Sequence, residues 1–217
     1  GPICITCGAR NTLGIITCEN CGDLLFTIDQ LPQKVFLPEQ TLLHGRYQLI
    51  ARIDQGGMRA VYKAVDTRFN NRPIVIKEMN RAALPPDHAQ EMVKFFEREA
   101  HLLADLLHFN LPRIYDLFTE SECSYQVMDF IEGKTLEDYY KKASGHPLPL
   151  EQVLKWVEQI CDVLSYLHMH QPSIIFRNLK PSNVMVSKGG HIYLIDFSIA
   201  CISGQFYESI VSGTLGF

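Results

Sequence analysis

The stretch from Ile174 to Ser198 constrains the fold of this chain more than any other part of the sequence. It reads IIFRNLKPSNVMVSKGGHIYLIDFS, which is a polar loop, a short apolar strand, a Lys-Gly-Gly turn and a second apolar strand that ends in Asp-Phe-Ser. Its polar side chains therefore lie at strand ends and turns, where a rigid scaffold can hold them toward a ligand. These residues are Arg177, Asn178, Lys180, Asn183 and Asp196.

The spacing of these polar residues resembles two motifs of the protein kinases. An Arg-x-x-Lys-Pro-x-Asn run is followed, thirteen residues after its Asn, by Asp-Phe. This is similar to the family's catalytic loop H-R-D-x-x-x-x-N and its D-F-G segment. The resemblance implies that Asn183 and Asp196 bind Mg²⁺ through oxygen atoms. It also implies that Lys180 lies at the γ-phosphate of ATP, because the L-K-P-x-N form is that of the serine/threonine kinases.

Asn178 is the main departure from the family pattern. Phe176-Arg177-Asn178 stands where the family has His-Arg-Asp, so Asn178 occupies the general-base position. An amide can orient a hydroxyl group but cannot accept its proton, and loss of a general base lowers a rate by ~10²- to 10⁴-fold. Nucleotide binding does not require that proton. We therefore expect a domain that binds ATP and Mg²⁺ and whose phosphotransfer to protein Ser or Thr is impaired.

Residues 47–79 contain three strand-like segments, YQLIARI, AVYKAVD and RPIVIKEM, joined by short turns. Such a succession predicts an antiparallel sheet. The turn after the first segment resembles the glycine-rich loop G-x-G-x-x-G-x-V of the kinases, in which backbone N–H groups approach the ATP phosphates. Only the middle glycine is present, as Gly56, whereas Asp54 and Arg59 occupy the positions of the other two.

A lysine and a glutamate follow this loop at kinase spacing. The run Ile-Val-Ile-Lys ending at Lys77 resembles the V-A-I-K strand, whose Lys holds the α- and β-phosphates. Val61 matches the valine of the loop motif, and Val75 replaces the family's Ala over the adenine ring, where its bulk would narrow the pocket. Apolar residues at helical spacing predict a helix over 87–108. Glu99 on that helix is implied as the partner of Lys77.

The resemblance extends to the segments that would contact adenine. SYQVMDFIEG resembles the fifth strand and the hinge of the kinases, with Met128 as gatekeeper and with Asp129 and Ile131 in the backbone that faces adenine. Met185 would form the floor of the adenine pocket. A second strongly periodic helix is predicted over 150–170, where the chain's single Trp is expected in the core.

Four of the seven cysteines lie within the first 21 residues, as two Cys-x-x-Cys pairs. Two such knuckles can close a tetrahedron of thiolates around one Zn²⁺ ion, which would supply the folding energy of so short a segment. The spacing resembles the small zinc ribbons of bacterial proteins; a pair of reactive or disulfide-bonded dithiols is the alternative. The predicted ligands are Cys4, Cys7, Cys18 and Cys21.

These features predict an α+β chain with a two-lobe, kinase-like fold and a small zinc ribbon. The expected division is a ribbon over 1–25, a linker over 26–43, an N-lobe over 44–131 and a partial C-lobe over 132–217. The sequence contains no A-P-E motif. The apolar face of helix 150–170 is therefore expected to be uncovered, which favours self-association or a protein partner.

The segment that would follow Asp-Phe carries candidate regulatory residues. Ser209, Ser212 and Thr214 are predicted phosphorylation sites, and Arg177 is the residue that a phosphate group there would meet.

Charge and hydropathy exclude two other classes of function. The net charge of −4 gives no reason to expect binding to nucleic acid, and no apolar run approaches the ~18 residues of a membrane span. Without a signal peptide, and with scattered thiols, the chain is expected in the cytoplasm of a bacterium. Two alternatives stay open: a catalytically active kinase in a full-length, Asp-containing form, and a protein-interaction scaffold that binds no nucleotide. The sequence also leaves open whether Asn178 is natural or introduced.

Overall fold

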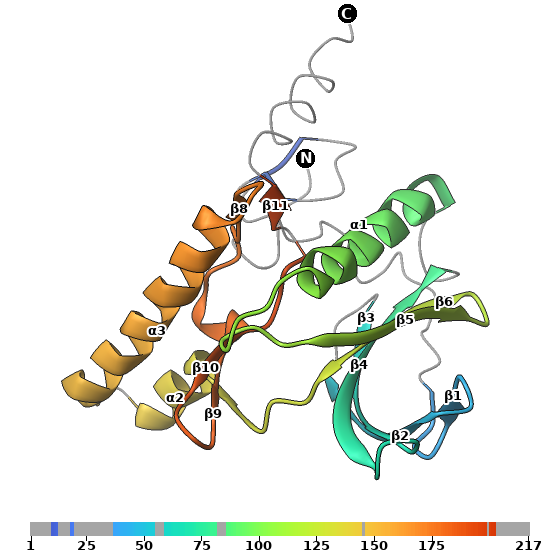
Figure 1. Cartoon of the computed structure of the whole chain (residues 1–217), viewed down its shortest axis with the longest axis horizontal. Coiled ribbons are helices and arrows are strands. Elements are labelled where there is room, and N and C mark those ends of the chain that lie inside the picture. Colours follow the sequence, from blue (N-terminus) through green and yellow to red (C-terminus); the bar gives the residue numbers. More distant parts are fainter. Residues whose placement is uncertain are drawn as a thin grey trace, which may run out of the picture. The chain divides into compact units, whose positions relative to one another are not determined.

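The structure is a computed structural model, and the chain divides into two compact units (Figure 1). The first unit comprises Gly1–Asp105 with Arg113–Phe130, and the second comprises Leu106–Pro112 with Ile131–Phe217. The residues that the structure describes are 10–12, 18–19, 37–54, 59–81, 86–144, 146–198 and 200–202.

The first unit is built on a six-stranded antiparallel sheet with the strand order β1-β2-β3-β4-β6-β5. The three strands predicted between residues 47 and 79 are confirmed as β2, β3 and β4, and the predicted linker adds the short strand β1. The strands are β1 (Leu42–Leu43), β2 (Tyr47–Asp54), β3 (Arg59–Asp66), β4 (Arg72–Asn80), β5 (Ile114–Glu120) and β6 (Cys123–Asp129).

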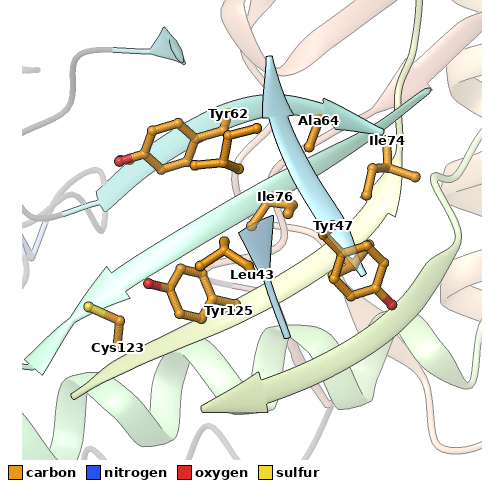
Figure 2. Packing of buried hydrophobic residues seen from close by; sticks show 11 residues of the cluster. Leu43, Tyr47, Tyr62, Ala64, Ile74, Ile76, Cys123 and Tyr125 are labelled. Carbon is orange, nitrogen blue, oxygen red and sulfur yellow. The ribbon is translucent and has the colours of Figure 1, made fainter. Parts of the chain in front are cut away.

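This sheet curls strongly, because strands near its two ends touch. The Tyr47 hydroxyl of β2 donates a hydrogen bond to Asp116 of β5 at 2.7 Å, and the Tyr47 and Phe118 rings stack with centroids 5.8 Å apart. The apolar face that the curl encloses is the core of the unit, and Figure 2 shows its side chains packed between the curved strands. The fully buried members include Tyr47, Tyr62, Ile74, Ile76 and Tyr125.

Helix α1 (Pro86–Ala104) packs in the same unit and contacts β5. Its buried side chains recur at helical spacing, as the sequence predicted, at Val93, Phe96, Ala100 and Leu103. A second attachment is polar, since the Gln126 Nε2 atom of β6 donates to the Phe96 carbonyl oxygen at 2.5 Å. The helix is therefore joined to the sheet by an apolar face and by a buried hydrogen bond.

The predicted extension of this helix to residue 108 is wrong. The helix ends at Ala104, and Leu107, which lies within the predicted range, is 73% exposed. One reason is tertiary, since the Leu107 N–H donates to the Tyr166 hydroxyl at 3.0 Å, and a local turn follows in which the Leu111 N–H donates to the His108 carbonyl at 3.1 Å. These bonds belong to the second unit and fix residues 106–112 as a loop of that unit.

The second unit combines a small antiparallel sheet with two helices. The sheet has the order β10-β9-β7, with β7 (Gly133–Thr135), β9 (Val184–Ser187) and β10 (Ile192–Leu194). A two-stranded ladder pairs β8 (Ile174–Ile175) with β11 (Cys201–Ile202). The helices are α2 (Leu136–Ala143) and α3 (Leu150–Met169), and α3 confirms the helix predicted over 150–170.

The start of α2 is fixed by its own sequence. Thr135 forms a capping box, in which its side chain accepts from the Asp138 N–H while the Asp138 carboxylate accepts from the Thr135 N–H.

Gly133, two residues earlier, allows β7 to approach β9. A Cβ atom at this position would lie 2.0 Å from the Val186 carbonyl oxygen. Only glycine therefore fits there without a shift of the backbone.

One side of α3 bears exposed apolar residues at helical spacing, namely Leu150, Leu154 and Val157. Trp156 is buried, as predicted. Self-association through this exposed face stays a prediction. In the part of the chain that the structure describes, neither α3 nor any other helix is both long and apolar enough to cross a membrane.

Candidate functional site

In the first unit, four of the predicted ATP-binding residues lie on one face of the curled sheet. Val61 of β3 is directly opposite Lys77 of β4, and Val75 of β4 is directly opposite Met128 of β6. Opposed residues and residues two apart along a strand point to the same face of a sheet. Val61, Val75, Lys77 and Met128 are therefore neighbours on the face opposite the buried residues Ile74 and Ile76.

The same face carries a close ion pair. The Lys77 Nζ atom lies 2.6 Å from Glu99 Oε1 of α1, and their side chains are 13% and 0% exposed. The burial of both groups means that the contact is weakly screened by solvent. The partnership between Lys77 and Glu99 that the sequence implied is thus present, and their roles toward ATP stay a prediction.

Asp129 ends β6, where the hinge was predicted, and its carboxylate is fully engaged within the first unit. It accepts hydrogen bonds from the Tyr115 hydroxyl and, at 2.9 Å, from the Arg113 N–H, while the Asp129 N–H donates to the Arg113 carbonyl at 3.0 Å. Next to it, the Lys63 ammonium lies 4.5 Å from the centroid of the Phe130 ring, within the range of a cation–π interaction. The Asp129 side chain thus fixes the backbone at this strand end.

In the second unit, the predicted catalytic and metal-binding residues form a hydrogen-bonded ring. The Asn178 Nδ2 atom donates to Asp196 Oδ2 at 2.8 Å, and the Asn183 Nδ2 atom donates to the Asn178 carbonyl at 3.0 Å. The Ile195 N–H, adjacent to Asp196, donates to the Asn183 carbonyl at 3.1 Å and closes the ring. Asn178 and Asn183 are only 8% and 7% exposed. We call this set, Asn178, Asn183, Ile195 and Asp196, the asparagine ring.

The backbone before Asn178 is strained. Arg177 has a φ of 61°, in the left-handed region that side chains other than glycine rarely adopt, and the Asn178 N–H donates to the Phe176 carbonyl at 2.8 Å across it. Such a conformation costs on the order of 1–3 kcal/mol and persists only where the surroundings enforce it. The fold thus holds Arg177 in a strained conformation, and Arg177 sets the direction of the chain into Asn178.

The remaining predicted residues of this unit lie around the asparagine ring. Lys180 is half-buried and its carbonyl accepts from the Asn183 N–H at 2.9 Å, at the start of the 3₁₀ turn Pro181–Asn183. Phe176 and Phe197 are both buried and meet edge to face, with ring centroids 4.8 Å apart. Met185 is half-buried on β9, opposite both Thr135 and Tyr193. Ile131, predicted to face adenine, is half-buried at the start of this unit.

The donor chemistry of the asparagine ring fits Mg²⁺. Mg²⁺ is usually held by one or two oxygen ligands from the protein together with waters and phosphate oxygens. Asp196 supplies a carboxylate, and the amide of Asn183 presents its oxygen because its nitrogen donates to the Asn178 carbonyl. Among the residues that the structure describes, no three His, Cys, Asp or Glu side chains gather into a fully protein-bound metal site. An open site of this kind is the one that a nucleotide-bound Mg²⁺ requires.

Several predicted site residues lie outside the described residues. They are Gly56 of the glycine-rich loop, the candidate phosphorylation sites Ser209, Ser212 and Thr214, and the candidate zinc ligands Cys4, Cys7 and Cys21. Cys18 is described and is buried. Near it, the Glu19 N–H donates to the Asn11 side chain at 2.8 Å.

Sequence reasoning missed two polar residues that position the site. Gln126 is fully buried on β6 opposite Lys77 and binds the α1 backbone. Asn110 joins residues 106–112 to β10 through two hydrogen bonds. Its side-chain Nδ2 atom donates to the Ile192 carbonyl at 2.8 Å, and its backbone carbonyl accepts from the Leu194 N–H at 3.0 Å. The available signal for Gln126 was an amide residue flanked by the apolar residues Tyr125 and Val127.

Comparisons with known proteins agree with this arrangement. The protein kinase domain family matches residues 47–217. The chain is 38% identical over 160 residues to the serine/threonine-protein kinase PrkC of Bacillus subtilis (strain 168), covering 73% of this chain and 23% of that protein. It is 35% identical over 155 residues to the probable serine/threonine-protein kinase PknB of Lactococcus lactis subsp. lactis, covering 71% and 24%.

A solved structure, described as the PpkA-294 apo form, matches with a TM-score of 0.65 and 20% identity, over 83% of this chain and 66% of the other. At this identity the match supports the fold alone. The chain spans about a quarter of the length of the two curated relatives it matches. The chain belongs to the protein kinase family, and the two curated relatives that it resembles are bacterial serine/threonine kinases by name.

Proposed function

We propose that this chain binds ATP with Mg²⁺ as a serine/threonine protein kinase domain and that its transfer of phosphate to protein Ser or Thr is impaired. The observation that carries nucleotide binding is the buried contact between Lys77 and Glu99. A lysine held at 2.6 Å by a fully buried carboxylate has a fixed position beside an apolar sheet face. Phosphate groups are the ligands that such a fixed ammonium group favours.

The roles follow from the chemistry of each group. Lys77 would bind the α- and β-phosphates, and Val61, Val75 and Met128 offer apolar surface for the adenine ring on the same sheet face. Asn183 and Asp196 would hold Mg²⁺, which when bound neutralises phosphate charge. Lys180 would contact the γ-phosphate. These assignments rest on the family's motifs together with the positions described above.

The impairment rests on Asn178. A general base must accept the proton of the attacking hydroxyl group, and the Asn178 amide has no basicity with which to do so. Its nitrogen donates to Asp196 at 2.8 Å, so that the amide is engaged as a hydrogen-bond donor. We therefore expect phosphotransfer ~10²- to 10⁴-fold slower than in an Asp-containing form of the same chain.

Calorimetric titration with ATP, with and without Mg²⁺, tests the binding proposal. We expect saturable binding that Mg²⁺ strengthens and that Lys77→Met abolishes. Lys94→Met, at an exposed position of α1, is the matched control and should bind as the wild type does. Absence of binding at millimolar ATP would defeat the proposal and favour a protein-interaction scaffold.

A phosphotransfer assay on a longer chain that carries the whole kinase domain tests the impairment. Asn178→Asp should raise autophosphorylation by at least ~10²-fold. Equal rates for the two proteins would show that Asn178 does not limit transfer. High activity of the Asn178 protein itself would favour an active kinase.

We also propose that residues 1–25 bind one zinc ion through Cys4, Cys7, Cys18 and Cys21, as expected of paired knuckles in a reducing cytoplasm. The burial of Cys18 supports this proposal. Metal analysis of the reduced protein should give one zinc per chain, and replacement of Cys18 by serine should lower that content. Protein without zinc under reducing conditions would contradict it.

We also propose that Ser209, Ser212 or Thr214 is phosphorylated and that Arg177 contacts the phosphate group, as the sequence predicts. Mass spectrometry of the purified protein tests this proposal.

A further inference from the structure

We infer that Gln126 is a positioning residue for Lys77, that it acts by fixing the part of α1 that carries Glu99, and that its presence lowers the stability of the first unit. The inference rests on the proposed function in one respect, since it takes Lys77 as the residue that binds the phosphates of ATP. It deepens that function because it assigns control of the ATP affinity to a side chain that does not contact solvent.

The place of Gln126 in the sheet explains why its effect must be indirect. Gln126 of β6 is directly opposite Lys77 of β4, so the two side chains leave the same face of the sheet. Gln126 is 0% exposed, and its side chain is therefore out of reach of a ligand on the protein surface. Any effect of Gln126 on ATP has to pass through the residues that it contacts.

The contact that Gln126 makes is with the backbone of α1. Its Nε2 atom donates to the Phe96 carbonyl oxygen at 2.5 Å. A carbonyl oxygen inside an α-helix accepts from the N–H group four residues later, and its second lone pair can accept from a side-chain amide. Phe96 precedes Glu99 by less than one helical turn. The bond therefore fixes the helix at the place where Glu99 meets Lys77 at 2.6 Å.

The other half of the Gln126 amide is unfavourable. Its Oε1 atom is buried and, in the part of the chain that the structure describes, has no hydrogen-bond partner. Such an acceptor loses its hydration without compensation. A methionine of similar length would avoid this penalty, and the Phe96 carbonyl would keep its bond within the helix. A buried residue that local energetics disfavours is expected where function requires it.

Gln126→Met should therefore separate ATP affinity from stability. The melting temperature should stay within about 2 °C of the wild-type value or rise, because the lost bond and the relieved penalty oppose each other. The dissociation constant for ATP with Mg²⁺ should rise about 5-fold or more, because Glu99 no longer holds Lys77 in one place. A purely structural residue would lower the stability and leave the affinity unchanged.

Ser124 offers a matched control. It lies two residues before Gln126 on the same face of β6 and is buried, and its Oγ atom likewise has no hydrogen-bond partner among the described residues. Ser124→Ala removes an unpaired polar atom there without removing a bond to α1. It should melt at the wild-type temperature or higher and should bind ATP as the wild type does.

A second comparison assigns the effect to Glu99. Glu99→Gln weakens the contact with Lys77, and in that background Gln126→Met should change the ATP dissociation constant by less than ~2-fold. Two changes that act through one residue are not additive. Full addition of the two losses would mean that Gln126 acts elsewhere, and it would overturn the inference.

The experiment is calorimetric titration of these proteins with ATP and Mg²⁺, combined with thermal unfolding and hydrogen exchange of the α1 amides without nucleotide. Weaker binding by Gln126→Met but not by Ser124→Ala, with faster exchange near Glu99 and no fall in melting temperature, supports the inference. Equal affinities, or a weaker affinity accompanied by a fall of more than about 5 °C in the Gln126→Met melting temperature, overturn it. Absence of ATP binding by the wild type would defeat the proposed function, whereas the exchange measured without nucleotide would still show whether Gln126 fixes α1 beside Glu99.

Discussion

The buried polar groups of the two units differ in kind. Within the described residues of the first unit, three of the six buried polar residues are carboxylates, namely Asp66, Glu78 and Glu99, and the other three are the neutral Asn11, Ser124 and Gln126. Within those of the second unit, all three are asparagines, Asn110, Asn178 and Asn183. Arg46 binds Asp66 through two hydrogen bonds at 2.9 and 2.7 Å, and Lys77 binds Glu99. The asparagines instead donate to backbone carbonyls, to the Gln159 side chain and to a single carboxylate.

This difference indicates how each unit responds to its surroundings. A buried ion pair becomes a large liability when one partner is removed or neutralised, because an uncompensated charge stays behind. A buried amide carries no net charge and does not titrate. The first unit should therefore depend on ionisation, whereas the interior of the second should depend on hydrogen-bond geometry. Four substitutions test this contrast, in order of decreasing effect.

Lys77→Met should have the largest effect on stability. It deprives the fully buried Glu99 carboxylate of its ammonium partner, and breaking a buried pair costs about 3–5 kcal/mol. We expect a loss near the upper part of this range, measured by urea unfolding with hydrogen exchange of the α1 amides as the local probe. Lys94→Met serves again as the control. A loss below about 1 kcal/mol would mean that the pair behaves like an exposed one.

Arg46→Ala should cost slightly less, about 3 kcal/mol. Asp66 is only 1% exposed, but it keeps the Arg68 N–H at 3.1 Å and the Arg72 guanidinium at 3.9 Å. Arg68→Ala is the control, since it preserves that N–H while removing a nearby charge. Equal losses for the two variants would show that the hydrogen bonds from Arg46 to Asp66 stabilise the fold no more than the charge of Arg68 does.

The same variant has a characteristic pH dependence. The hydrogen bonds from Arg46 hold the pKa of Asp66 below its usual value. The stabilisation is therefore present above the unfolded-state pKa of about 3.9 and is lost as the pH falls through the lower folded-state value. Wild-type stability should decline in this acid range, and Arg46→Ala should show a shallower decline. Identical acid profiles would contradict the assignment.

Asn110→Ala should cost about 2 kcal/mol, because the Ile192 carbonyl loses a buried donor at 2.8 Å. No charge is exposed or neutralised by this change. The loss should therefore stay constant as the pH falls below about 3.9, whereas that of Arg46→Ala shrinks in this acid range. Unfolding followed across this range by hydrogen exchange of the β10 amides provides the measurement. A loss that varies with pH as steeply as that of Arg46→Ala would break the comparison.

Glu137→Gln should have the smallest effect, about 0.3 kcal/mol. Glu137 and Lys141 are one helical turn apart on α2, 3.0 Å from each other, and both are exposed. Water and salt screen such a pair, so the loss should vanish in concentrated salt. Thermal unfolding at low and high salt measures it. A loss comparable to that of Lys77→Met would show that burial does not govern these pairs.

Much of the fold could be predicted because its signals are local. Alternating apolar residues specified β2, β3 and β4, and helical spacing specified α1 and α3. The spacing of Lys77 and Glu99 within matching motifs correctly placed them as partners. For the same reason, Asn178, Asn183 and Asp196 could be assigned to one site from a short stretch of sequence, and they lie within hydrogen-bonding distance of one another.

What could not be predicted depends on contacts between residues far apart in the sequence. The end of α1 at Ala104 depends on two distant partners. Leu107 forms a hydrogen bond with Tyr166, and Asn110 forms one with Ile192. Periodicity carries no trace of such partners. The donor role of the Asn178 amide toward Asp196 was likewise not evident, because a motif specifies residue types and leaves their hydrogen-bond directions open.

The two polar attachments of α1 have a mechanical consequence. Phe96, whose carbonyl binds Gln126, and Glu99, which binds Lys77, are three residues apart and so lie on the same side of the helix. A helix attached through one hydrogen bond can still rotate about its axis, whereas two hydrogen bonds on the same side restrict that rotation. Any motion of α1 that turns Glu99 away from Lys77 must therefore strain or break the Gln126 bond as well. Rotation of α1 about its axis therefore requires both hydrogen bonds to break together.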